Sequence, residues 1–114
     1  MLMQHLHQFF GGPALIRKLF SSPALFATIA LFFDFPHDPL FPRLISRQTG
    51  TDIKSVLREL KKLHEIGVVR ARRAGREMHY RLNEEFHLYE ELAAVFAKTR
   101  KQRKYASQDL EFYA

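Results

Sequence analysis

The sequence lacks cysteine, and it lacks any apolar run long enough to cross a membrane. Without cysteine the chain can form no disulfide, no thiolate metal site and no cysteine nucleophile, which is typical of a protein from a reducing compartment. The longest apolar stretch, residues 24–33, is well short of the roughly 20 residues that a membrane-spanning helix needs. The first ten residues lack the basic start of a signal peptide. We therefore expect a cytoplasmic protein.

The motifs of the common enzyme classes are missing as well. The chain has no nucleotide-binding glycine loop, no nucleophile elbow and no motif of paired carboxylates. Its six histidines are scattered, and His5 and His7 could bind zinc only if His37 or Asp38 joined them in space. We therefore predict that the protein is not an enzyme and has no metal site and no cofactor.

Positive charge is what the chain has in excess, and it is concentrated in one stretch. The 114 residues fit a single domain with a net charge of +6. Between positions 43 and 81, eleven lysines and arginines stand against four acids, a net +7, whereas seven basic and eight acidic residues elsewhere give −1. Such a field attracts a polyanion, because each phosphate that is neutralised releases condensed counterions. A solvated basic surface is the simpler alternative.

Helical spacing of apolar residues dominates the first half of the chain. After an N-terminal extension at residues 1–12, we expect a helix over residues 13–20 that starts at a proline. Ser22 should cap a second helix over residues 23–33, which is apolar nearly all round and so belongs to the core or to a subunit contact. A shorter helix is expected over residues 39–48.

A tight turn then leads into a longer helix. Gly50 should end the preceding helix in the left-handed conformation, Thr51 should cap the next one, and Asp52 should lie in its first turn. The helical pattern continues to Ile66, and Gly67 ends it. The two helices and their turn predict a helix-turn-helix unit.

The longer helix has two different faces. Its polar side combines short hydroxyls near the N-terminus, Thr51 and Ser55, with the cations Lys54, Arg58 and Lys62. This mixture suits a helix that enters the major groove, where Arg58 is the best candidate to read guanine because its planar fork can bond two acceptors. An ordinary solvated face is the alternative. The apolar residues fall on one arc that should pack inward: Ile53, Val56, Leu57, Leu60 and Leu63.

A basic β-hairpin is expected next. Residues 68–71 give one strand, Met78, Tyr80 and Leu82 alternate along the next, and Gly75 permits the positive φ of a short connection. Such a hairpin would be a wing that contacts phosphates or a narrow minor groove. Alternatively, the charge only protects an edge hairpin against aggregation. Three cations are expected around the tip: Arg72, Arg73 and Arg76.

A final helix should close the domain, which we place at residues 13–104, ahead of a tail at 105–114. Asn83 is expected to cap this helix, with Glu84 and Glu85 at its positive end. Its apolar stripe could pack on the first helices of the same chain or on a second subunit, and we favour a homodimer. The stripe consists of five residues: Phe86, Tyr89, Leu92, Ala93 and Phe96.

The segment VLRELKKLHEIGVVRARRAGREMHYRLN, followed by EEFHLYEEL, carries a resemblance. Together with the helices before it, it resembles the winged helix-turn-helix transcriptional regulators of the ArsR-like class, in particular a bacterial and archaeal group that accompanies minimal nucleotidyltransferases. The resemblance covers residues 16–99. It implies a mostly dimeric DNA-binding protein with its recognition helix at residues 51–65 and its wing at 72–78. No nucleotidyltransferase follows in this chain, and the cysteine sites of metal-sensing relatives are missing.

Taken together, these features predict a mainly α fold with a small β-hairpin, a winged helix-turn-helix of order α-α-α-α-β-β-α. The predicted function is sequence-specific regulation of transcription by a homodimer bound to double-stranded DNA. The alternative is an interaction module that docks a protein such as a nucleotidyltransferase, which would present apolar residues on the same helix face. The predicted DNA contacts are Arg43, Arg47, Thr51, Lys54, Ser55, Arg58, Lys62, Arg72, Arg73 and Arg76.

Overall fold

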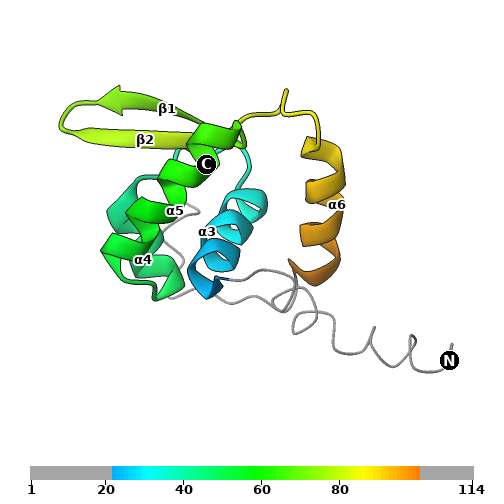
Figure 1. Ribbon diagram of the computed structural model, residues 1–114, viewed down its shortest axis with the longest axis horizontal. Helices are drawn as coiled ribbons and strands as arrows, with labels where there is room; N and C mark the ends of the chain where they lie inside the picture. Colours follow the sequence, from blue (N-terminus) through cyan, green and yellow to red (C-terminus); the bar gives the residue numbers. More distant parts are fainter. Residues whose placement is uncertain (1–21, 101–114) are drawn as a thin grey trace, which may run out of the picture.

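The computed structural model describes residues 22–100, and the helix expected over residues 13–20 lies outside them. Figure 1 shows the hairpin projecting from one end of the molecule and α6 at the other end, with α3 between α5 and α6. This arrangement confirms the mainly α, winged-helix fold for the described part. None of the described helices is both long and apolar enough to span a membrane. The elements are α3 (Pro23–Asp34), α4 (Pro42–Thr49), α5 (Ile53–Ile66), β1 (Val69–Ala74), β2 (Glu77–Leu82) and α6 (Tyr89–Thr99).

Helix α3 is the central helix, and it begins where the sequence predicts. The Ser22 hydroxyl accepts a hydrogen bond from the backbone N–H of Leu25 at 3.1 Å, which satisfies one of the free donors of the first turn. Phe26, Ile29 and Phe32 are buried in the core. The nearly all-round apolar composition of α3 is explained by its position, because α4, α5 and α6 all pack against it.

Helix α4 is shorter at its start than expected. The prediction that helical structure begins at residue 39 is wrong, because Leu40 pairs with Tyr80 of β2 instead. The Leu40 N–H donates to the Tyr80 carbonyl at 2.8 Å, and the Tyr80 N–H donates to the Leu40 carbonyl at 2.7 Å. A residue in extended pairing cannot also start a helix, so α4 begins at Pro42, whose fixed φ suits the first helical turn.

The turn between α4 and α5 has a different cap from the one predicted. Gly50 is left-handed with φ 71°, as expected, but Asp52 and not Thr51 is the N-cap of α5. The Ser55 N–H donates to the Asp52 carboxylate at 2.7 Å, and this hydrogen bond lowers the pKa of Asp52. The Thr51 carbonyl accepts from the Ser46 hydroxyl at 2.6 Å. Thr51 therefore joins the two helices, and Gly67 ends α5 as predicted, with φ 92°.

Strands β1 and β2 form an antiparallel hairpin with a two-residue turn at Gly75 and Arg76. Gly75 has φ 65° and is the only one of the two with a positive φ, as in turns whose first central residue is glycine. Val69 lies opposite Leu82, and both are buried. The base of the hairpin is therefore part of the core, while the tip is outside it.

The start of the last helix was also predicted wrongly. Helix α6 begins at Tyr89, so Asn83 does not cap it, and Glu84 and Glu85 lie in the loop before it. The Asn83 amide instead closes the hairpin, because its Nδ2 donates to the Gly67 carbonyl at 2.9 Å. Its Oδ1 accepts from the Glu85 N–H at 3.0 Å. A side chain that joins both ends of the hairpin is not free to cap a helix.

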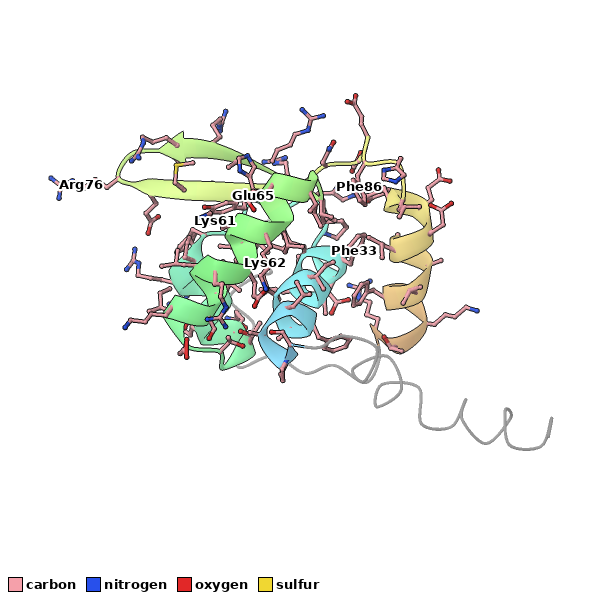
Figure 2. The ribbon with its side chains drawn as sticks, in the orientation of Figure 1. Phe33, Lys61, Lys62, Glu65, Arg76 and Phe86 are labelled. Carbon is pink, nitrogen blue, oxygen red and sulfur yellow. The ribbon has the colours of Figure 1, made fainter. Side chains whose placement is uncertain are left out.

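The apolar stripe of α6 packs on the same chain. Phe96 is fully buried, with its ring 5.3 Å from that of Phe33 and 5.8 Å from that of Phe26. Tyr89 also contacts Phe33, at 5.8 Å between ring centroids. Figure 2 shows Phe33 between α3 and α6. The first of the two predicted partners for the stripe, the chain's own helices, is therefore the one observed.

One buried hydroxyl in α3 yields a prediction about stability. Thr28 is fully buried, and its Oγ1 has no hydrogen-bond partner within residues 22–100. Replacing the hydroxyl by a methyl group in Thr28→Val should raise the free energy of unfolding by about 1 kcal/mol, because an unsatisfied buried polar group is removed at nearly constant shape. Urea unfolding measures this change. Thr28→Ser is the control, since it keeps the hydroxyl and removes the methyl group; a Val variant less stable than wild type would contradict the prediction.

Candidate nucleic-acid interface

Helix α5 is rotated about its axis relative to the prediction. Val56, Leu60 and Leu63 are buried as expected. Ile53 and Leu57, however, are 38% and 48% exposed, so their assignment to the inward arc is wrong. The inward position on the other side of the arc is taken by a charged residue, Glu59, which is fully buried. The apolar pattern alone would place this carboxylate at the surface.

The Glu59 carboxylate is held by three groups at the junction of α5 with the start of α3. The Ser22 hydroxyl donates to its Oε2 at 3.2 Å, and Nε of Arg58 lies 3.4 Å from the same oxygen. The Lys62 ammonium lies 3.4 Å from Oε1. That oxygen makes no hydrogen bond within the described residues, so the contact with Lys62 is electrostatic. Two cations and one hydroxyl thus offset the cost of burying the charge.

The contacts with Glu59 hold in place two of the residues that were predicted to contact DNA. Arg58 and Lys62 remain 57% and 55% exposed although each contacts Glu59. Nη2 of Arg58 also donates to the Ser55 hydroxyl at 3.3 Å, which orients the guanidinium along the helix. The structure therefore brings Ser55, Arg58 and Lys62 together on one side of α5, with Glu59 beneath them.

The rotation adds a cation to the exposed face that the prediction omitted. Lys61 and Lys54 are exposed; the charge of Lys54 contributes to the lowered pKa of Asp52, whereas no ion pair of Lys61 is found among residues 22–100. Figure 2 shows Lys61 on the side of α5 toward which the hairpin projects, and Lys62 on the side of α3. The signal that could have revealed this face is the charge spacing around Glu59, with Arg58 adjacent and Lys62 three residues on.

Of the predicted contacts on α4, Arg43 is tied to the hairpin. Its guanidinium bonds the Glu77 carboxylate of β2, and this bond lowers the pKa of Glu77. The same guanidinium lies 5.9 Å from the centre of the Phe41 ring. Arg47 is exposed in the last turn of α4. Arg43 therefore joins α4 to the wing.

The arginines of the hairpin do not form one cluster. Neighbouring residues of a strand point to opposite faces, so Arg72 and Arg73 lie on opposite sides of the sheet. Arg73, opposite Met78, is on the face that packs against the helices at its base, and Arg72, opposite His79, is on the outward face. Arg76 is in the turn, and Figure 2 shows it at the far tip of the hairpin.

Two further arginines were missed by the predicted site. Arg70 lies directly opposite Arg81 on the outward face of the hairpin. Arg70 donates to Asn83 Oδ1 at 3.0 Å and to Glu85 at 2.9 Å. Arg70 lies two residues before Arg72 on β1, and Arg81 lies two residues after His79 on β2. This spacing of two, which places residues on the same face of a strand, was the signal that could have identified both arginines.

The described residues hold no cluster of three or more side chains able to ligate a metal ion. His37 lies 3.7 Å from the Glu84 carboxylate at the surface. His5 and His7 lie outside the described residues.

The contact between Ser22 and Glu59 gives a second prediction. Ser22→Ala should lower the free energy of unfolding by about 1 to 3 kcal/mol, because it removes both the cap of α3 and a donor to a buried carboxylate. Ser22→Thr is the matched control, since threonine keeps the hydroxyl and should stay close to wild type. The measurement is urea unfolding at neutral pH, and equal stability of the Ala and Thr variants would contradict this role of Ser22.

Comparison with protein-family models, with curated proteins and with solved structures gives no match for this chain.

Proposed function

We propose that the protein is a sequence-specific regulator of transcription that binds double-stranded DNA, with α5 in the major groove and the hairpin as a wing. The observation that carries the proposal is the exposed face of α5, where Lys54, Arg58 and Lys61 have no apolar cover, beside a projecting hairpin with Arg76 at its tip. Double-stranded DNA is the polyanion whose shape fits a helix flanked by a β-ribbon. A cytoplasmic location belongs to the same proposal.

The dimensions of α5 support this proposal. Fourteen residues give a helix of about 21 Å, and its diameter of about 10 to 12 Å matches a major groove about 12 Å wide. Asp52 caps the N-terminus of α5 and accepts from one of its free N–H groups, that of Ser55, so the helix dipole is partly neutralised there. Attraction to DNA would therefore come from the side chains of α5 and not from its N-terminus.

The side chains of α5 divide into two roles in this proposal. Arg58 is the base reader, since Glu59 and Ser55 hold its guanidinium before DNA arrives and so lower the entropy lost on binding. Lys54, Lys61 and Lys62 are point charges suited to phosphates. On the hairpin, Arg73 and Arg76 would contact the backbone or the minor groove beside α5.

A homodimer is part of the proposal, with the contact near α6. Leu88 and Val95 are large apolar residues of this region that stay exposed after the stripe has packed on α3. A second copy would cover them and would place two α5 helices on successive major-groove faces, about 34 Å apart. Figure 1 shows α6 at the end of the molecule away from the hairpin, which leaves the wing free in such a dimer.

The alternative function, docking of a protein partner such as a nucleotidyltransferase, is favoured by one observation. Ile53 and Leu57 are exposed one helical turn apart on α5, and a protein-docking helix presents residues of this type. In the DNA-binding proposal the same side chains would contact sugar carbons or a thymine methyl group. Binding to DNA therefore decides between the two functions.

Two substitutions on α5 test the proposal. Arg58→Ala should relax base preference and cost about 1 to 3 kcal/mol on the selected site only, because a two-acceptor contact with guanine is lost. Lys61→Ala should weaken binding to all duplexes and lower the slope of log K against log salt by about 1. Fluorescence anisotropy with a duplex selected from a random pool measures both effects. The spacing of paired half-sites in that duplex reports the dimer.

Lys98→Ala in the last turn of α6 is the matched control, since it removes one exposed lysine far from the hairpin. Its affinity should stay within about twofold of wild type, because an exposed charge more than a Debye length away is screened. No enrichment in the selection, together with equal affinities for all three variants, would reject DNA binding through α5 and favour docking of a protein.

A further inference from the structure

The outward face of the hairpin, which points away from the helices, carries a second group of cations. The register places Arg70 opposite Arg81 and Arg72 opposite His79 on this face. The inward face begins with the buried pair Val69 and Leu82 and belongs to the core. The backbone of the hairpin therefore separates an inward surface from an outward surface, and the two face in opposite directions.

The segment before α4 widens this outward face. Because Leu40 pairs with Tyr80 and its side chain is buried, its neighbours Pro39 and Phe41 are on the opposite, outward side of the sheet. The Phe41 ring stacks on the His79 ring, with 5.5 Å between centroids and 22° between planes. The stack holds the imidazole in place beside Arg72. Strands β1 and β2 and residues 39–41 thus form one outward surface, which we call the platform.

The surface of the platform contains a pocket. An open depression of about 490 Å³ is lined by Pro39, Arg70, Arg72, His79 and Arg81, among others. Its lining holds three guanidinium groups and an imidazole and no acidic side chain. The neighbouring acids are at its margin: Glu85 contacts Arg70 at 2.9 Å, and Glu77 lies 3.5 Å from His79.

The charges of the platform are poorly balanced in the free protein. Like charges directly opposite each other on neighbouring strands destabilise a sheet, and Arg70 and Arg81 are such a pair. Arg72 and Arg81 have no acidic partner within residues 22–100. An anion with several charges, bound in the depression, would relieve this repulsion.

We propose that this outward platform is a second phosphate-binding site, which takes the backbone of a second nucleic-acid duplex while α5 holds the first. The proposal goes beyond the proposed function, because a duplex in contact with α5 lies on the other side of the hairpin. Guanidinium groups suit phosphate because their planar forks can bond two oxygens. The protein would then join two duplex segments, in addition to reading one.

The test uses a chain in which the α5 surface is disabled by Lys54→Ala, Arg58→Ala and Lys61→Ala. Anisotropy at low salt with a labelled 20-base-pair duplex should show residual binding from the platform. Adding Arg72→Gln and Arg81→Gln should weaken that binding at least about tenfold and lower its salt slope by about two, as expected for two lost phosphate contacts. Residual binding that Arg72→Gln and Arg81→Gln leave unchanged would overturn the proposal.

A matched control removes two positive charges at the end of the molecule away from the hairpin. Lys98→Gln with Arg100→Gln changes the net charge equally, but at the end of α6. In the α5-disabled chain this pair should change the residual affinity less than about threefold, since only the long-range field is altered. Equal losses for the two pairs would mean a general charge effect and would also overturn the proposal.

Two further arms identify the ligand and separate this proposal from the proposed function. Inorganic phosphate, at constant ionic strength, should not displace the duplex at millimolar concentration; stoichiometric displacement would assign the platform to a small phosphate compound instead. If the α5-disabled chain binds the selected duplex as tightly as wild type does, the proposed role of α5 fails. In that case the effect of Arg72→Gln and Arg81→Gln on duplex binding is the only remaining test of the platform proposal.

Discussion

The buried carboxylate of Glu59 determines which residues α5 presents to solvent. A carboxylate inside a protein needs partners, and here Ser22, Arg58 and Lys62 supply them at 3.2 to 3.4 Å. These contacts can form only if α5 is turned so that Glu59 faces the start of α3. The same rotation moves Leu57 outward. The orientation of the candidate reading face is therefore an electrostatic consequence of one acid in the core.

The hairpin has its own constraint, which is the pairing of Leu40 with Tyr80. Two backbone hydrogen bonds fix β2 against the segment before α4, and the ion pair of Arg43 with Glu77 adds a third link. The base of the wing is thereby held relative to α4 and α5, whereas Arg76 at the tip is free of the core. Because strands alternate, the arginines of this hairpin serve two surfaces with different geometry.

In the proposed function, these constraints assign base reading and general attraction to DNA to different residues. On α5, Arg58 is oriented by neighbours, while Lys54 and Lys61 are exposed point charges. The internal carboxylate also neutralises part of the charge that the composition assigns to this surface, so a count of lysines and arginines overstates the field that a phosphate would meet. In the proposed complex with DNA, geometry and charge would thus limit affinity and favour selectivity.

The sequence alone determined the order of the elements, the cap at Ser22 and the helix ends at Gly50 and Gly67. Local rules suffice for these features, because a cap or a left-handed glycine depends on residues a few positions away. Asn83 and the start of α4 were predicted wrongly for the opposite reason: both are set by partners distant in the chain, Gly67 for one and Tyr80 for the other.

The candidate site shows the same division. The sequence located the basic stretch and the two elements that carry it, since charge and periodicity are local. Only the tertiary structure decided the rotation of α5, the exposure of Lys61 and which of Arg72 and Arg73 lies on the outward face of the sheet. Each of these depends on which groups meet across the core, and an apolar pattern cannot show that an acid such as Glu59 finds its partners there.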